Sequence, residues 1–196
     1  MAKTLTATAT AEEKGSILKA FPLISEIRDE NLKNMVIETW AQVWRESPYQ
    51  DLTTAPNTSS ALGGTQKLVD HIALVGTLAL SMADAMERVY GPIVNRDVLI
   101  ADVVLHDVDK LVMYERKENR VDGTELGKAI PHGNYGALVA FRVGIPREIV
   151  STVLNHSVFS SKVDPTTLEG VLLRYSDHAA FQGDRILSGL PPLHGI

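Results

Sequence analysis

The sequence predicts an all-α protein that folds as a bundle of helices. Apolar residues recur three and four positions apart in several long segments, which is the spacing of an amphipathic helix. No segment shows the alternation of apolar and polar residues that is typical of strands. With 196 residues, of which 44% are hydrophobic, the chain is long enough to bury a core of its own, and we expect one compact domain.

Composition restricts the classes of function. The formal net charge is −5 and no block of lysine and arginine is present, so we expect no nucleic-acid partner and no anionic membrane partner. The chain contains no cysteine, which excludes disulfides, thiolate nucleophiles, zinc fingers and iron–sulfur clusters. Any metal ion must therefore be held by histidine, aspartate and glutamate.

The N-terminal part predicts an irregular start followed by a helical flank. Residues 1–14 are rich in threonine and alanine, and we expect them to be disordered. They lack the apolar stretch of a signal peptide, and no later segment looks long and apolar enough to span a bilayer, so we expect a cytoplasmic protein. Residues 15–65 should form a helical flank and a long connection, because 47–65, SPYQDLTTAPNTSSALGGT, is full of turn-forming residues.

The helix within this flank is predicted by its apolar spacing. In residues 29–46, Leu32, Val36 and Trp40 follow one another at steps of four, as on the buried face of a helix. Asp29 is a suitable N-cap, since its carboxylate can accept hydrogen bonds from the free amides of the first turn.

The main bundle is expected at residues 66–184, and its first two helices bring polar residues onto apolar faces. In residues 66–90, His71 shares a stripe with Leu68 and Val75. The next helix should begin near Asn95 or Asp97 and run through VVLHDVDKLVMY to residue 115. A histidine and an aspartate lie in the middle of this apolar run.

The second half of the bundle also places polar residues on the apolar faces or at the ends of its helices. After a charged loop at 115–131, a short helix begins near His132, and its Gly136 allows a neighbour to approach closely. The helix that starts at Pro146 places His156 on the face of Val153, and the helix after Pro165 carries Asp177. We expect residues 185–196 to be an irregular tail.

Six polar residues, carried on or at the ends of five predicted helices, suggest a metal site. One histidine on an apolar face is usually a hydrogen-bonded core residue. Burying four imidazoles and two carboxylates is costly unless something compensates their lone pairs and charges, and a metal centre does so. Ligands of this kind suit iron, manganese, cobalt, nickel or zinc. The six candidates are His71, His106, Asp107, His132, His156 and Asp177.

The ordered set resembles the HD-domain superfamily of metal-dependent phosphohydrolases, in its variant with six ligands and two metal ions. The local sequences LHDVDK, HGNYGA and LLRYSDHA are similar to the ligand motifs of that family, and the resemblance covers about residues 68–181. It implies an HD-domain helical bundle with the metal site between its central helices. Asp109 stands where many members carry glycine, and NHS has one histidine where some cyclic-dinucleotide phosphodiesterases have two, which argues against that subgroup.

The resemblance also implies a role for each ligand. His71, His106, Asp107 and Asp177 would hold the first of two divalent transition-metal ions. His132 and His156 would complete the second, with Asp107 bridging the two ions.

The residues around the His–Asp pair allow more than one reading. Lys110 lies one turn beyond the pair on a helix, where it can stabilise charge on a phosphate or form an i,i+3 ion pair with Asp107. We expect both Lys110 and Asp107 to be catalytic. Asp102 can orient His106 from one turn earlier, although an exposed aspartate is the simpler reading. Further candidates for gripping a phosphate are Arg116, Lys117, Lys128, Arg142 and Arg174, for which a solvated surface position is favoured.

Two metal ions that share a carboxylate activate water for attack on phosphorus. We therefore expect hydrolysis of a small phosphorylated substrate such as a nucleotide. Two alternatives stay open. Relatives with the same ligands include mixed-valent diiron oxygenases that cleave C–C or C–P bonds, and a non-catalytic metal-binding sensor would use the same residues. The oligomeric state is open as well, with a homodimer among the options.

Overall fold

The computed structural model describes residues 8–62 and 66–193, and it confirms the prediction of an all-α fold. A two-stranded hairpin of β1 (Tyr114–Lys117) and β2 (Arg120–Gly123) is attached to the helices. Short 3₁₀ helices are η1 (Pro22–Glu26), η2 (Leu52–Thr54) and η3 (Ser60–Leu62). The α-helices are α1 (Ala11–Ala20), α2 (Glu30–Glu46), α3 (Leu68–Tyr90), α4 (Arg96–Leu105), α5 (Lys110–Met113), α6 (Glu125–Ala129), α7 (Asn134–Val143), α8 (Arg147–Asn155) and α9 (Leu168–Leu187).

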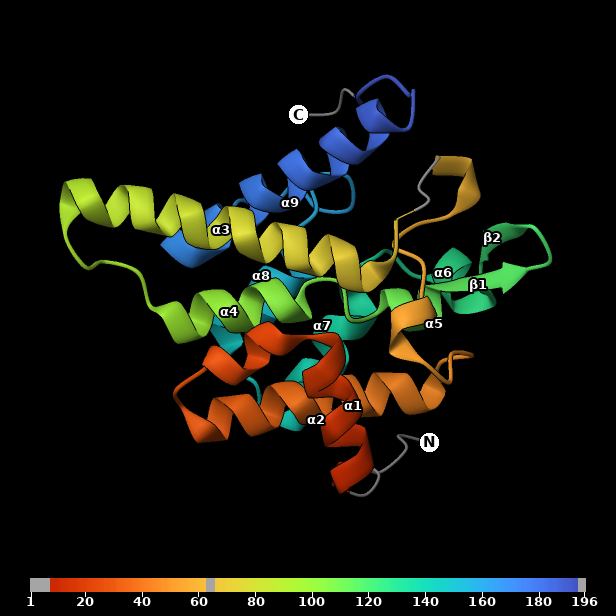
Figure 1. Cartoon of the computed structure of the whole chain (residues 1–196), viewed down its shortest axis with the longest axis horizontal. Coiled ribbons are helices and arrows are strands. Elements are labelled where there is room, and N and C mark those ends of the chain that lie inside the picture. Colours follow the sequence, from red (N-terminus) through yellow and green to blue (C-terminus); the bar gives the residue numbers. More distant parts are fainter. Residues whose placement is uncertain (1–7, 63–65, 194–196) are drawn as a thin grey trace.

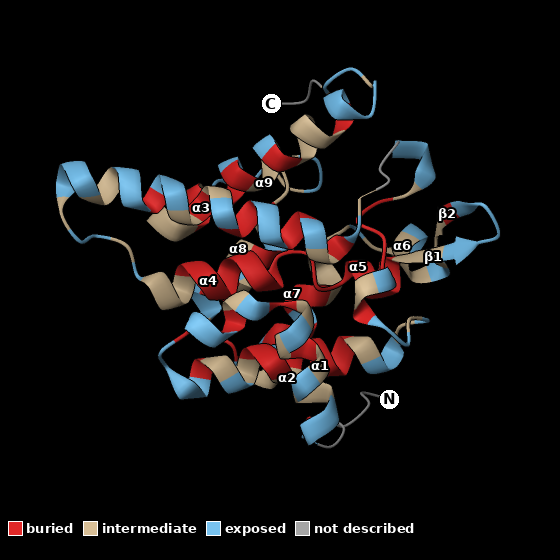
Figure 2. Cartoon of the chain, viewed as in Figure 1, coloured by how far each residue is buried: buried red, intermediate tan, exposed pale blue. Residues whose placement is uncertain are grey.

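Helix α4 lies at the centre of the bundle and contacts α2, α3, α8 and α9. Figure 1 shows α3 and α9 on one side of it and α1 with α2 on the other. Seven consecutive residues of this helix, 99–105, are buried, which gives the largest block of buried residues in the middle of Figure 2. A helix that is apolar all round must be covered on every side, and this explains its central place.

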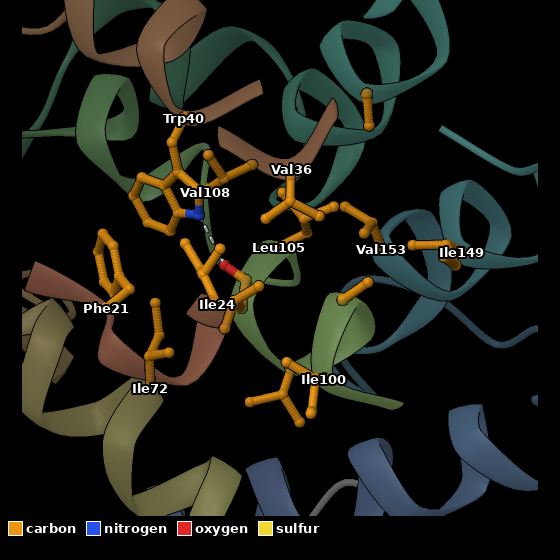
Figure 3. Packing of buried hydrophobic residues seen from close by; sticks show 14 of the residues in the cluster. Phe21, Ile24, Val36, Trp40, Ile72, Ile100, Leu105, Val108, Ile149 and Val153 are labelled. Atoms are coloured by element: carbon orange, nitrogen blue, oxygen red, sulfur yellow. Dashed lines mark hydrogen bonds between the residues drawn. The ribbon is translucent and has the colours of Figure 1, made fainter. Parts of the chain in front are cut away.

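Helix α2 packs against this centre through Trp40. The indole ring is fully buried and stacks on Phe21, with ring centroids 4.0 Å apart. Its Nε1–H donates a hydrogen bond of 3.0 Å to the carbonyl of Val104 (Figure 3). The bond satisfies the one polar atom of a large apolar side chain. As predicted, Asp29 caps the helix by accepting from the amides of Asn31 and Leu32.

Both ends of the chain are more helical than expected. Helix α1 already begins at Ala11, because Thr10 and Glu13 form a capping box in which each side chain accepts from the backbone amide of the other residue. The expected disordered segment 1–14 is therefore helical in its last part, and residues 1–7 lie outside the described residues. At the other end α9 continues to Leu187, into the expected tail, of which residues 194–196 are not described.

The charged segment 115–131 is not only a loop. Its residues form part of the β1–β2 hairpin, with Tyr114 opposite Gly123 and Lys117 opposite Arg120, and they also form α6. The hairpin turns at Glu118, whose φ is 49°. Both strands are short and rich in charged residues, so they lack the alternating pattern from which strands are predicted.

The expectation that no segment could span a bilayer was wrong for α3. This helix has 23 residues and a mean hydropathy of 1.4, which meets the requirements of length and composition. It packs along α9 and α4 and buries His71, Ile72, Val75 and Ala79 in the protein. Packing against these two helices accounts for its apolar character.

Close packing of α7 depends on Gly136, as the sequence predicted. A Cβ built on Gly136 would come within 2.8 Å of Val108 Cγ1 and 3.5 Å of the Asp109 amide nitrogen. Val108 is fully buried, and its β-branched side chain has few alternative rotamers. The glycine therefore lets α7 approach the turn that follows α4.

We expect Gly136→Ala to lower the free energy of unfolding by about 1–3 kcal/mol, the cost of overpacking a core. This loss exceeds the gain of about 0.5–1 kcal/mol from replacing a helical glycine. The matched control is Gly15→Ala in α1, where a new Cβ meets nothing within 4 Å. This substitution should stabilise the protein. Urea unfolding of both variants measures the two changes. An unchanged or raised stability for Gly136→Ala would contradict the packing argument.

Candidate metal centre

The structure brings all six predicted side chains together. His71 comes from α3, His106 follows the last residue of α4, and Asp107 lies in the turn between α4 and α5. His132 precedes α7, His156 follows α8, and Asp177 lies within α9. Helices distant in sequence thus meet at one point, where the side chains form two groups that share Asp107.

The first group consists of His71, His106, Asp107 and Asp177, with donor atoms within 4.8 Å of one another. His71 Nε2 lies 3.0 Å from Asp177 Oδ1 and 3.2 Å from Asp107 Oδ2. His106 Nε2 lies 3.1 Å from Asp107 Oδ2. Two imidazole nitrogens and two carboxylate oxygens therefore converge in the protein interior.

The second group consists of Asp107, His132 and His156. Asp107 uses its other oxygen here, because Oδ1 lies 2.8 Å from His132 Nε2 and 3.5 Å from His156 Nε2. The two Nε2 atoms are 3.1 Å apart. One carboxylate thus presents a different oxygen to each group, which is the arrangement of a bridging ligand.

A break in the predicted helix 95–115 creates this arrangement. Helix α4 ends at Leu105, and the following turn is held by i→i+3 hydrogen bonds, among them Val108 N to Leu105 O and Lys110 N to Asp107 O. Tight turns of this type often occur at functional sites. The prediction of one continuous helix was wrong here. A turn with i→i+3 hydrogen bonds keeps nearly the same spacing of apolar residues, so the sequence pattern does not reveal it.

The histidines are oriented so that their Nε2 atoms point into the groups. His106 Nδ1 donates to the Val103 carbonyl at 2.6 Å, and His156 Nδ1 donates to the Val153 carbonyl at 2.8 Å. A carbonyl can only accept, so each Nδ1 carries the proton and each Nε2 keeps its lone pair. This tautomer is the one that binds a metal ion through Nε2.

A metal ion fits this site if the lone pairs of the histidine Nε2 atoms have no hydrogen-bond donor. Within residues 8–62 and 66–193, His106 Nε2 is buried without a hydrogen-bond partner. The facing Nε2 atoms of His132 and His156 repel each other unless a proton or a metal ion lies between them. Buried acceptors of this kind, assembled from nitrogen and oxygen, suit a divalent transition metal.

The pKa shifts of the ligand residues favour the protonation states that bind a cation at Asp107 and His156. Burial acts to raise the pKa of Asp107, but its neighbours His106 and Lys110 hold it well below its usual range. Burial lowers the pKa of His156, which keeps its imidazole neutral. For His132 burial is outweighed by Asp109 and Asp107, which raise its pKa to about 10. Binding of a metal ion through His132 Nε2 is therefore expected to release a proton.

Asp109 lies beside this second group. Its Oδ1 is 2.9 Å from His132 Nδ1, and its Oδ2 accepts a hydrogen bond of 2.7 Å from the Gly133 amide. Gly133 has a φ of 88°, which favours glycine, and a Cβ there would meet the Val153 carbonyl at 2.8 Å. The carboxylate thus fixes both the loop and the ring of His132.

Lys110 combines the two roles that the sequence left open. Its Nζ lies 2.6 Å from Asp107 Oδ2, so the i,i+3 ion pair is present. It also donates to Asn57 Oδ1 at 2.8 Å, and the residue is only 8% exposed. Lys110 lines the cavity above the two groups as well.

The readings of Asp102 were wrong. The residue is fully buried and not exposed. It does not orient His106, whose Nδ1 donates to the Val103 carbonyl instead. Burial, reinforced by the charge of Glu169, raises the pKa of Asp102 well above its usual value. This carboxyl group is therefore part of the core.

A cavity of about 360 Å³ opens onto the two groups. Asp107, His132, His156 and Asp177 all line it. Its other walls include the hydroxyl residues Thr58, Ser157 and Ser160 and several apolar side chains. Its size lies in the range of pockets for small-molecule ligands.

The other basic candidates do not extend into this cavity with free donors. Arg174 lines it, but its guanidinium donates to the backbone carbonyls of Asn155, His156 and Val163. Lys128 is exposed and paired with Glu125. The remaining three are exposed residues outside the cavity lining: Arg116, Lys117 and Arg142.

Sequence reasoning missed two contributors. Asn57 lies in the long connection before α3 and reaches Lys110, 53 positions later. No periodicity marks a loop residue, so nothing in the sequence pointed to it. Asp109 was noted only as a departure from a motif, although a carboxylate two positions after a ligand aspartate was an available signal.

We expect Asp109→Asn to weaken metal binding by the second group by about 10- to 100-fold, the usual loss when the partner of a ligand histidine is changed. An asparagine that still accepts from Gly133 turns its NH₂ towards His132 Nδ1 and disfavours the required tautomer. Calorimetric titration with manganese should show one weakened site and one unchanged site. Asp122→Asn, in the hairpin, is the matched control. Equal weakening of both sites would contradict a local effect on His132.

Comparisons with known proteins give one curated relative with a clear match. The dihydroneopterin 2′,3′-cyclic phosphate phosphodiesterase of Methanocaldococcus jannaschii is 29% identical over 165 residues. The match covers 80% of this chain and 66% of the relative, so the chain spans a little less than two thirds of the relative's length. No protein-family model matches the chain. No solved structure matches it either.

Proposed function

We propose that this protein is a metal-dependent phosphohydrolase of the HD-domain type, with two divalent transition-metal ions bridged by Asp107. One observation carries the proposal. A single buried carboxylate presents one oxygen to each of two ligand groups, at a cavity that is also lined by a lysine. Hydrolytic sites with two metal ions are built in this way.

The relative supports the reaction class. Its name describes the hydrolysis of a cyclic phosphodiester on a small molecule. We infer that this protein also hydrolyses a small phosphate ester. A five-membered cyclic phosphodiester is the first substrate to test. The oxygenase and sensor alternatives have no such support.

The proposed ligand sets follow the two groups. His71, His106, Asp107 and Asp177 would hold one ion, and His132 and His156 with Asp107 would hold the other. Ions bound there supply Lewis acidity towards phosphoryl oxygens and a water molecule of lowered pKa. The ionised Asp107 keeps the two groups in register, and the Nδ1 bonds of His106 and His156 hold both imidazoles in the ligand tautomer.

Lys110 is the proposed catalytic side chain next to the ions. Burial acts to lower its pKa, but Asp107 and Asp177 outweigh this and raise it, so the amine is protonated. Asn57 and Asp107 hold the ammonium at the cavity wall. There it can donate to an oxygen of the reacting phosphate as negative charge develops.

The test is metal analysis of protein purified with and without oxygen, followed by assays with dihydroneopterin 2′,3′-cyclic phosphate and an aryl phosphate. We expect one to two transition-metal ions per chain, on the basis of the two groups. We also expect ester hydrolysis without oxygen uptake, which is lost on chelation and restored by manganese or iron. Oxygen uptake with both esters intact would favour the oxygenase. Bound metal without any turnover would favour the sensor.

A further inference from the structure

The cavity extends from the ligand groups to an aromatic wall. Phe159 lies in the loop between α8 and α9, and His178 and Phe181 lie on α9. The Phe159 ring is 5.5 Å from Phe181 and 5.9 Å from His178, measured between centroids. Phe159 is 48% exposed although it lines the cavity. An aromatic face is therefore available beside the candidate metal centre.

The loop that carries Phe159 is fixed at both ends. Arg174 donates to the carbonyls of Asn155 and His156 before Phe159 and to that of Val163 after it. His156 belongs to the second ligand group. One buried arginine thus sets the position of the aromatic ring relative to the candidate metal ligands.

Two further lining residues, Leu62 and Leu193, are also held in place. Arg185 donates to the Leu62 carbonyl at 2.8 Å and lies over the Phe181 ring at 5.9 Å. Gln182 forms two hydrogen bonds with the backbone of Leu193, of 2.8 and 3.0 Å. Leu62 and Leu193 both line the cavity. A preorganised wall binds a ligand with little loss of conformational entropy.

We infer that this wall is a subsite for a planar heteroaromatic group of the substrate, with the Phe159 ring as its stacking partner. The inference rests on the proposed function, because the ring binds while the phosphate lies at the metal ions. Arg185 lies over the Phe181 ring, whereas the Phe159 ring is half exposed, so Phe159 is the more accessible stacking partner.

A heteroaromatic ring fits this wall better than an alkyl chain. The hydroxyl residues Thr58, Ser157 and Ser160 also line the cavity. A ring with polar edge atoms can form hydrogen bonds with such hydroxyls, whereas an alkyl chain displaces their water without replacing its hydrogen bonds. Ligand pockets commonly combine aromatic walls with a few polar groups in this way.

The experiment compares two esters with the same five-membered cyclic phosphate. Guanosine 2′,3′-cyclic phosphate carries a heteroaromatic ring, and glycerol 1,2-cyclic phosphate does not. Manganese-loaded wild type, Phe159→Leu and Phe159→Trp are assayed for kcat/KM. Affinity for guanosine, which has no phosphate, is measured by NMR titration. Phe141→Leu is the matched control, since Phe141 is 57% exposed on α7 and does not line the cavity.

We expect Phe159→Leu to lower both kcat/KM for the guanosine ester and affinity for guanosine by about five- to 100-fold, the range for loss of one stacking partner. The glycerol ester should be unaffected, Phe159→Trp should retain wild-type values, and Phe141→Leu should match wild type. An equal loss for both esters, or unchanged guanosine affinity, would overturn the inference and leave the proposed function intact. If neither these two esters nor dihydroneopterin 2′,3′-cyclic phosphate and the aryl phosphate are hydrolysed, the proposed function fails, and the guanosine titration decides the inference alone.

Discussion

Asp107→Asn is expected to remove most of the bound metal and to lower turnover more than about 1,000-fold, equivalent to about 4 kcal/mol. Among residues 8–62 and 66–193, no other side chain contributes to both ligand groups. Asparagine keeps the volume of aspartate but loses the charge that balances Lys110 and the histidines. Metal content per chain, measured after gel filtration, and hydrolysis of the cyclic phosphodiester are the two readouts.

The same measurement on the other ligands tests the division into two groups. Asp177→Ala should weaken the group that contains His71 and His106, and His156→Ala should weaken only the group that contains His132. Folding is checked by circular dichroism, because a buried ion pair that loses one partner costs about 3–5 kcal/mol. Full metal retention by a folded Asp107→Asn protein would refute the bridging role. Loss of both ions in every variant would refute the separate groups.

The candidate centre was largely predictable because helical periodicity assigns each residue to a face. His71 shares a stripe with Leu68 and Val75, and all three are buried in α3. Polar residues on buried faces of separate helices favour a shared buried site, and the resemblance to the HD-domain superfamily implied how they divide into two groups. The same reasoning predicted a helix over the apolar run that contains α4.

The features that could not be predicted depend on local geometry or on contacts between loops. The i→i+3 turn after Leu105 keeps helical dihedral angles at His106, whose φ is −53° and ψ is −37°, so its sequence still looks helical. Asn57 meets Lys110 only because the connection before α3 folds over the cavity. The exposure of Phe159 was not predictable either, since its loop is held by Arg174 from another element.

Lys110→Met should lower turnover by about 10- to 1,000-fold, the scale for loss of one preorganised electrostatic partner of a transition state. Methionine keeps the length of the side chain but cannot donate to a phosphate oxygen. The folded protein should also lose about 1–3 kcal/mol of stability, because the buried Asn57 Oδ1 loses its donor. Metal content should stay at the wild-type level, since Lys110 is not in either ligand group.

The control is a lysine-to-methionine substitution at another lysine that forms an i,i+3 ion pair. Lys128 pairs with Glu125 at i,i+3 and 2.8 Å, as Lys110 pairs with Asp107 at 2.6 Å, but the Lys128 side chain is 60% exposed. Lys128→Met should therefore leave turnover and stability unchanged, because solvent screens an exposed ion pair. If Lys110→Met also turns over at the wild-type rate, Lys110 is only a structural ion-pair residue. If it loses metal together with activity, its effect passes through Asp107, and the lysine positions the bridging carboxylate instead of the phosphate.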